Sequence, residues 1–181
     1  MNEKEFVESF KKIAPAKEDL TKLNLPEDFI NDLLNSYNCE EKVSPASKRF
    51  SDNILLNLIS GYDCSKAEIG MIRFLPEVIE KPAFYQVGKL DVDVLVLDKI
   101  SLGINVVDAR KPRHIMWKCA SNGEKFLEAL LISAKFLVSK LNDMENEPDP
   151  ATIFRYVNQC SEVAGGDEYK KFYKLILGYF E

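Results

Sequence analysis

A run of short apolar segments with the period of β-strands occupies the middle of the chain. Strands are expected around Ile69–Phe74, Phe84–Val87, Val92–Leu97, Ile104–Val107 and Ile115–Trp117. The breaks between them are short and contain Pro76, Pro82, Gly88, Gly103 and Pro112. Parallel neighbours need crossovers of about a dozen residues, and no break is that long. The sequence therefore predicts a central antiparallel sheet of about five strands across residues 69–118, in an α+β fold.

The segments before this sheet have apolar residues at the spacing of amphipathic helices. Residues 3–13 place Phe6, Val7, Phe10 and Ile13 on one face, and Pro15 follows as a stop. The next expected helix has Asn24 as its cap and Pro26 near its first turn. Its expected buried stripe is Phe29, Ile30, Leu33, Leu34 and Tyr37. A polar surface connection is expected over residues 38–51, before a short helix capped by Ser51 or Asp52 that carries Ile54, Leu55, Leu58 and Ile59 and ends at Gly61.

Three further helices are expected after the sheet. The first starts with a capping box of Ser121 and Glu124 and should lie across the sheet. Its apolar face comprises Phe126, Leu127, Leu130, Leu131, Ala134, Leu137, Val138 and Leu141. Asp149 and Pro150 start the second, which stops at Gly165 and Gly166, and Asp167 caps an aromatic-rich third helix that contains Tyr169, Phe172, Tyr173, Ile176, Tyr179 and Phe180. These last two helices, residues 149–181, form an extension whose aromatic residues either pack on the core or offer a partner site.

The length and net charge of the chain restrict the classes of protein to which it can belong. A chain of 181 residues with a 46% hydrophobic share suits a single domain spanning residues 1–181. Its net charge of −5 disfavours nucleic-acid binding, which depends on clustered cations, and suits a basic partner. No apolar run has the length of a membrane span, and the N-terminal residues lack a secretion-signal core. We expect a cytoplasmic protein with no membrane contact.

Four cysteines lie far apart in the sequence, at positions 39, 64, 119 and 160. They form no CxxC pair, and the chain has only one histidine. Structural zinc sites draw paired ligands from short loops, so this pattern disfavours such a site. We expect buried, reduced thiols that pack as small apolar side chains.

Four aspartates occur in the stretch GKLDVDVLVLDKISLGINVVD, which starts at Gly88. Asp91 and Asp93 form a DxD pair that could hold a divalent metal carrying substrate phosphates. No phosphate-binding glycine loop and no basic residue of fixed spacing accompanies the pair, so solvation of the outer face or end of a strand explains it better. Asp98 and Asp108 each end an apolar run, where aspartate commonly bonds the local backbone.

His114 is the only candidate for a catalytic imidazole base. Nothing selects a nucleophile for it, since Cys119 is five residues further on and odd spacing would place it on the opposite face of a strand. His114 is better explained as a surface residue of the basic turn ARKPRH, which holds Arg110, Lys111 and Arg113. The common signatures GxGxxG, GxxxxGK, HExxH and GxSxG are absent.

Three pieces in fixed order resemble the SUKH superfamily of Smi/Knr-type proteins. They are LPEDFINDLL from Leu25, the Gly88 stretch, and WKCASNGEKFLEALL from Trp117. The resemblance covers about residues 25–141 and leaves out the C-terminal extension. Within it, Gly88, Asp93, Gly103, the runs 94–98 and 104–108, and Phe126 with Leu127 stand at the matching places.

This resemblance implies a non-enzymatic binding protein without a cofactor, of a family used in bacteria as immunity proteins. Such a protein neutralises a cognate toxin, often a nuclease, by covering its active surface, and an acidic chain suits a basic nuclease domain. Asp91, Asp93, Asp98 and Asp108 are then candidates for the protein-binding face. Two alternatives stay open: a regulatory scaffold of the same fold with several partners, and a metal-dependent enzyme that uses Asp91 and Asp93. The oligomeric state is left open by the sequence.

Overall fold

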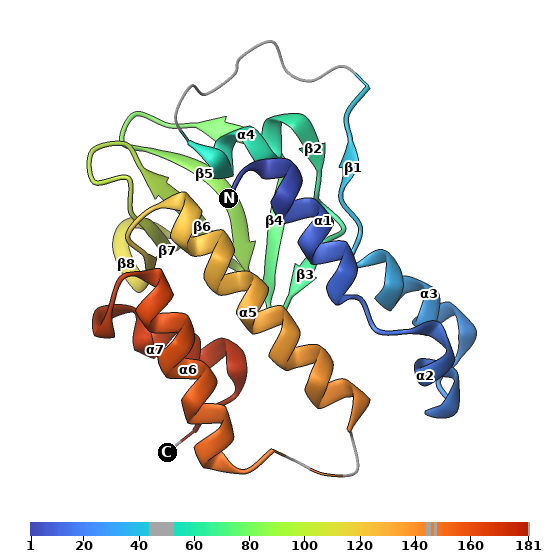
Figure 1. The fold of residues 1–181 in the computed structure, drawn as a ribbon. Helices are drawn as coiled ribbons and strands as arrows, with labels where there is room; N and C mark the ends of the chain where they lie inside the picture. Colours follow the sequence, from blue (N-terminus) through green and yellow to red (C-terminus); the bar gives the residue numbers. More distant parts are fainter. Residues whose placement is uncertain (44–52, 144–145, 147, 181) are drawn as a thin grey trace.

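The computed structural model describes residues 1–43, 53–143, 146 and 148–180 and has an α+β architecture (Figure 1). The helices are α1 (Glu3–Ile13), α2 (Lys17–Lys22), α3 (Glu27–Asn35), α4 (Ile54–Gly61), α5 (Gly123–Asn142), α6 (Pro150–Ala164), the 3-10 helix η1 (Asp167–Tyr169) and α7 (Lys170–Leu177). The strands are β1 (Glu40–Glu41), β2 (Tyr62–Asp63), β3 (Glu68–Ile69), β4 (Ile72–Glu80), β5 (Phe84–Leu90), β6 (Asp93–Asp98), β7 (Ile104–Asp108) and β8 (Lys111–Ala120).

The central sheet is the antiparallel meander that the short breaks predict. Its order is β3-β4-β5-β6-β7-β8, so each strand pairs with its neighbours in sequence, and every pair is antiparallel. Strands β1 and β2 form a separate two-stranded sheet. None of the described helices combines the length and the apolar character needed to cross a membrane.

Three expected boundaries within the sheet are wrong. The segment expected as one strand over residues 69–74 is two strands, because Gly70 turns the chain with a φ of +62° between β3 and β4. Pro76 was expected to break the strand, yet it lies within β4. The pairing of β4 with β5 shifts register between Phe74 and Ile79, and such irregularities are where a strand accommodates proline. Pro112 likewise lies inside β8, at the edge of the sheet.

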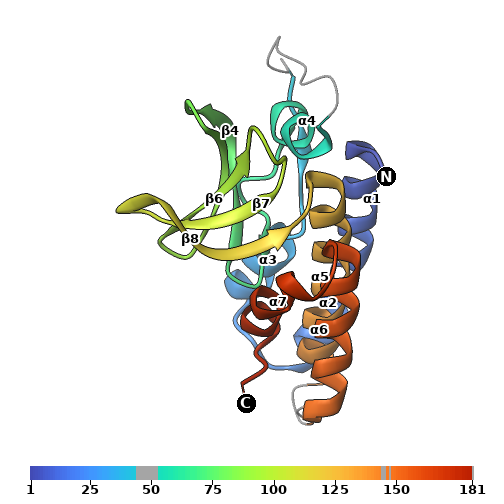
Figure 2. The ribbon, with the colours of Figure 1, turned by 90° about the vertical axis from the view of Figure 1, so that its left-hand side faces the viewer.

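The helices stack on one face of the sheet. Figure 2 shows α1, α5, α6 and α7 on one side of the curved sheet and no described helix on the other. Strand residues such as Leu95 and Val106 point into this side and are fully buried. They belong to one hydrophobic cluster with Phe126 of α5, as expected for a helix that lies across the sheet. Phe172 of α7 is part of the same cluster, so the C-terminal extension packs on the core.

The first helices fit their expected periodicity, and one cap differs. In α1, Phe6, Val7 and Phe10 are buried and Asn2 forms the capping box with Glu5. The α4 helix is capped by the side chain of Asn53, which accepts a hydrogen bond from the backbone N–H of Leu56 at 3.2 Å. The expected caps Ser51 and Asp52, and most of the polar connection before them, lie outside the described residues.

The α2–α3 pair differs from its prediction. The α2 helix was not anticipated, and Pro26 rather than Asn24 is the N-cap residue of α3. Asn24 adopts a φ of +53° in the turn between these helices. Only Ile30 is buried within α3, and Phe29, expected in the buried stripe, is 52% exposed.

Two other expected caps are wrong. Asn122 caps α5 by accepting from the backbone N–H of Lys125 at 2.9 Å, whereas the hydroxyl of Ser121 is buried without a partner among the described residues. Glu124 instead forms a 2.7 Å ion pair with the N-terminal amine of Met1. Asp167 begins the 3-10 helix and pairs with Lys170 at 2.7 Å, while Asp149 caps α6 as predicted.

Candidate functional site

The structure separates the four aspartates between the two ends of the sheet. The β3–β4, β5–β6 and β7–β8 turns meet at one end, where the backbone N–H of Asp91 donates to the carbonyl of Met71 at 3.2 Å. Asp93 and Asp108 lie at the same end. Asp98 is at the other end of β6, about 17 Å of strand away at the usual antiparallel rise. One end of the sheet thus holds three of the four aspartates.

Asp93 and Asp108 stabilise the turn between β7 and β8. Asp93 Oδ1 accepts from the backbone N–H of Ala109 at 3.3 Å. Asp108 Oδ1 accepts from the backbone N–H groups of Arg110 and Lys111 at 2.7 and 3.2 Å. Both carboxylates therefore have a local structural role of the kind expected for Asp108.

Asp98 holds the β6–β7 turn in the same way. Its Oδ1 accepts from the backbone N–H groups of Ile100 and Ser101 at 3.0 and 2.7 Å, and from the Ser101 hydroxyl at 2.9 Å. These bonds, above all the one from the Ser101 backbone, lower the pKa of the Asp98 carboxyl. The charged form is therefore favoured in the folded protein.

We expect Asp98→Asn to lower the free energy of unfolding at neutral pH by about 1 kcal/mol, because an amide oxygen accepts these bonds less strongly than a carboxylate. A folded pKa below the unfolded value gives stability that is present above the unfolded pKa and is lost as pH falls through the folded pKa. The difference between the two proteins should therefore shrink below the reference pKa of 3.8. Urea unfolding at several pH values measures this, and a difference that stays constant down to full protonation would contradict it.

Asp91 is the aspartate whose carboxylate has no hydrogen-bond or ion-pair partner among the described residues. It is exposed and has a φ of +52°, which aspartate tolerates better than most residues. It lines a pocket of about 320 Å³ with Glu68, Met71, Arg73 and Lys89. In the described part of the chain, no group of three or more metal-ligating side chains accompanies the Asp91 and Asp93 pair.

His114 is exposed, whereas the four cysteines are buried. His114 is exposed on β8, rather than in the turn where it was expected, and Cys119 on the same strand is fully buried. All four cysteines are buried free thiols. Burial raises the pKa of the Cys119 thiol, and it raises that of Cys160 to about 11. These thiols stay protonated near neutral pH, in keeping with the expected packing role.

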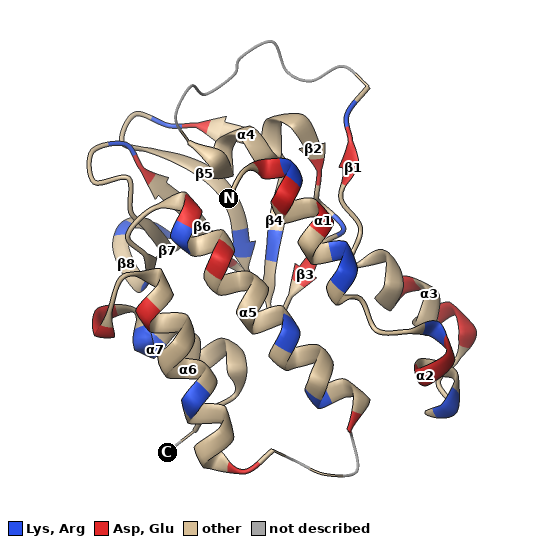
Figure 3. Ribbon diagram, viewed as in Figure 1, with Lys and Arg blue, Asp and Glu red and all other residues tan. Residues whose placement is uncertain are grey.

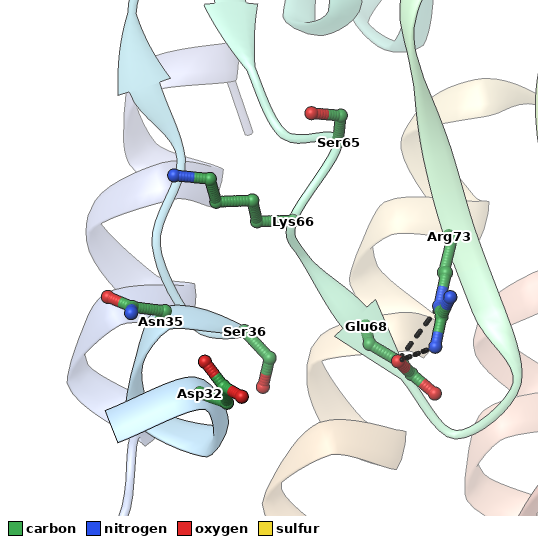
Figure 4. Close-up of a pocket in the computed structure, with 7 residues that line it drawn as sticks. All are labelled: Asp32, Asn35, Ser36, Ser65, Lys66, Glu68 and Arg73. Atoms are coloured by element: carbon green, nitrogen blue, oxygen red, sulfur yellow. Dashed lines mark hydrogen bonds and ion pairs between the residues drawn. The ribbon is translucent and has the colours of Figure 1, made fainter. Parts of the chain in front are cut away.

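Three adjoining pockets run along the β3 edge of the sheet, and we call them together the α3–β3 groove. The middle pocket, about 440 Å³, lies between α3 and the β3–β4 hairpin (Figure 4). It shares Asp32, Ser36 and Glu68 with a second pocket, and Glu68 and Arg73 with the pocket at Asp91. Glu68 and Arg73 form an ion pair at 2.6 Å across the hairpin. Asp32 has no such partner among the described residues.

The second pocket, about 390 Å³, is the apolar part of the groove. Phe29 and Leu33 of α3 line it on one side, and Leu137 and Leu141 of α5 on the other. The exposed ring of Phe29 thus stands beside an apolar hollow with the Asp32 carboxylate at its border. This combination suits an apolar side chain of a partner that is flanked by a cation.

The α2–α3 segment, whose helix α3 lines this part of the groove, is acidic. The α2–α3 segment carries five carboxylates against two lysines, and Figure 3 shows them on the paired helices. Lys17 pairs with Glu27 at 3.7 Å and Lys22 with Asp19 at 2.7 Å. The remaining carboxylates, Glu18, Asp28 and Asp32, are exposed and have no ion-pair partner among the described residues. The α2–α3 segment, which carries the exposed Phe29 ring, thus has three more carboxylates than lysines.

Sequence reasoning missed this surface. It assigned Phe29 to the buried stripe of α3 and confined the candidate binding residues to the strand aspartates. The density of carboxylates on residues 17–32 was visible in the sequence and could have marked an acidic surface. The Glu68 and Arg73 pair could not be found, because it depends on the turn at Gly70.

Comparison of the chain with protein-family models, curated proteins and solved structures found no match.

Proposed function

We propose that this chain is a non-enzymatic protein-binding domain and, most concretely, an immunity protein that neutralises a cognate basic toxin by covering its active surface. The observation that carries the proposal is the exposed Phe29 ring beside the Asp32 carboxylate at the apolar end of the α3–β3 groove. Aromatic residues in such positions are frequent anchors of protein interfaces. The resemblance to SUKH proteins supplies the toxin as the partner.

Charge supports a basic partner. A nuclease binds phosphates with a cluster of cations, and an acidic surface of matching extent competes for the same cluster. The unpaired carboxylates of α2–α3 provide that surface, and complementary charge speeds encounter and disfavours wrong partners. Asp91 lies along the same groove and can contribute, whereas Asp98 at the far end of β6 lies outside this surface.

The experiment is affinity capture of the tagged protein from lysate of its native source, at low and moderate salt. A single basic protein in roughly equal amount, released by salt, supports neutralisation by a tight complex, and its activity can then be assayed with and without the captured chain. Several specific partners instead would favour a regulatory scaffold. Recovery of the chain alone, with a basic partner shown to be expressed, would contradict the proposal.

We expect the double change Phe29→Ala and Asp32→Asn to weaken binding of the captured partner by about tenfold or more, because it removes an aromatic anchor and its neighbouring charge. The matched control is Ile100→Ala with Glu162→Gln. It also removes one exposed apolar side chain and one exposed carboxylate, from other surfaces. Titration calorimetry compares the three proteins, and an equal effect of both double changes would rule out the groove as the interface.

A further inference from the structure

Strand β8 is an open edge of the sheet over its first half. The sheet order ends at β8, which pairs with β7 on one side. Residues 111–116 are all exposed. The second half is covered, since the Tyr173 hydroxyl of α7 donates to the carbonyl of Cys119 at 2.9 Å and Lys118 pairs with Glu168 at 2.7 Å. Backbone groups of the first half are therefore open to an added strand.

This open edge is basic, in a chain whose net charge is −5. Between Asp108 and Glu124 all ionisable side chains other than the Cys119 thiol are basic, and Arg110, Lys111 and Arg113 precede or begin the open half. None of these three has an ion-pair partner among the described residues, and Figure 3 shows basic residues on β8. Extra cations without local partners favour a ligand of opposite charge.

The same residues disfavour pairing of the edge with a second copy of this chain. Charges, a proline and register irregularities are the usual protections of an edge strand. Strand β8 has Lys111 and Arg113, Pro112, and three register shifts against β7. The cations repel another basic strand and attract an acidic one, so they select the partner as well as protect the edge.

Two exposed apolar side chains lie on the open edge. Ile115 is 49% exposed and Met116 is 40% exposed. A register shift of β8 against β7 lies at these residues, since Val107 pairs with Ile115 and Val106 with Trp117, so the regular alternation of faces does not apply to them. An added strand with apolar residues among its carboxylates would contact these two exposed side chains.

We propose that residues 111–116 of β8 bind an extended acidic segment of a partner protein as an added strand of the sheet. Main-chain hydrogen bonds to the open edge supply affinity, and Lys111 and Arg113 supply the charge preference, as in other cases of strand addition. The proposed site is at the opposite edge of the sheet from the α3–β3 groove. It is independent of the toxin proposal.

The test uses the full chain and a short synthetic peptide that alternates Glu or Asp with Val or Ile. We expect NMR shift changes at the backbone amides of residues 113–116, with slower hydrogen exchange there. Changing Lys111 and Arg113 to Glu should weaken binding by about tenfold or more. The control variant, Lys11→Glu with Lys12→Glu, has the same charge change at exposed sites on α1 and should bind as the parent does.

Two further probes separate strand addition from charge attraction alone. Peptide N-methylated at alternate residues keeps its charge but loses half of its backbone donors, and it should bind at least tenfold more weakly. Equal binding of the methylated peptide, or an equal loss in both reversed variants, would overturn the proposal. So would perturbation of amides outside β8, or tighter binding of a single-stranded oligonucleotide to the same residues.

Discussion

Replacing Gly88 with alanine should lower the free energy of unfolding by about 3 kcal/mol. A Cβ at this position would lie 2.6 Å from the carbonyl oxygen of Arg73 and 3.1 Å from Cδ2 of Leu95. Gly88 on β5 is paired with Phe74 on β4 and with Leu95 on β6, so the obstructing carbonyl belongs to a central pairing. A backbone atom there cannot move away as the end of a flexible side chain could. Urea unfolding measures the loss, which is large for a domain stable by about 5–15 kcal/mol.

Gly61→Ala is the matched control for this change. Gly61 is the last residue of α4, and a Cβ there would meet no atom of the described residues within 4 Å outside its chain neighbours and the backbone of its own helix. Alanine should therefore leave stability unchanged or raise it by about 0.5 kcal/mol, through the smaller conformational freedom of the unfolded chain. If the free energy of unfolding of Gly88→Ala stayed within about 0.5 kcal/mol of that of the parent, the close approach of β4 and β5 at Gly88 would be contradicted.

The order and direction of the strands could be predicted because short connections leave few choices. The breaks around Gly88 and Gly103 are too short for a crossover, so antiparallel neighbours are the sole outcome, and the structure confirms it. The apolar faces of α1 and α5 could be predicted for a similar reason. An amphipathic helix turns its apolar stripe towards the core, so the period in the sequence identifies most of the covered residues. The expected face of α5 is not covered completely, since Leu131, Leu137 and Leu141 are only partly buried, whereas Phe136, outside that face, is buried.

Proline positions illustrate why strand boundaries were less predictable. Proline lacks a backbone donor, which suggests the end of a strand. Pro76 lies where the pairing of β4 with β5 is irregular, and Pro112 lies at the edge of the sheet. At both positions the absence of a backbone N–H group costs little stability. A bulge and an edge are properties of the assembled sheet, and the local sequence around each proline does not specify them.

The acidic character of the candidate surface could be predicted from the sequence, but its place in the fold could not. The sequence predicted an acidic face on the strand aspartates, and its role in protein binding stays a prediction. Three of these four aspartates hold turns through backbone hydrogen bonds. Phe29 has the spacing of a buried residue, but α3 is a nine-residue helix beside the edge of the sheet and buries only Ile30. Periodicity identifies an apolar face, and only the packing of neighbouring elements determines how much of that face is covered.

The C-terminal extension lies outside residues 25–141, so its relation to the core decides how it should respond to mutation. Tyr173 is fully buried and lies in the same hydrophobic cluster as Phe126 of α5. Burial also raises the pKa of its hydroxyl, which therefore stays protonated and donates to the Cys119 carbonyl on β8. One side chain thus joins α7 to the covered half of the sheet edge.

We expect Tyr173→Ala to cost about 3–5 kcal/mol of unfolding free energy, since it removes a fully buried aromatic ring and leaves a cavity. Tyr173→Phe keeps the ring and removes only the hydroxyl. Its cost should be about 1–2 kcal/mol, because the buried Cys119 carbonyl then loses the 2.9 Å hydrogen bond. Urea unfolding followed by both fluorescence and circular dichroism measures these losses and shows whether the chain unfolds in one transition.

Phe180→Ala is the control from the same extension, because Phe180 is 80% exposed and its removal should change stability by less than about 0.5 kcal/mol. If the extension were a separate unit, Tyr173→Ala would unfold α6 and α7 alone and leave the main transition unchanged. A single transition that shifts as a whole would instead mean that the sheet, α5 and the last two helices share one core. The open half of β8 would then owe its position to α7, since Tyr173 fixes the strand immediately beyond it.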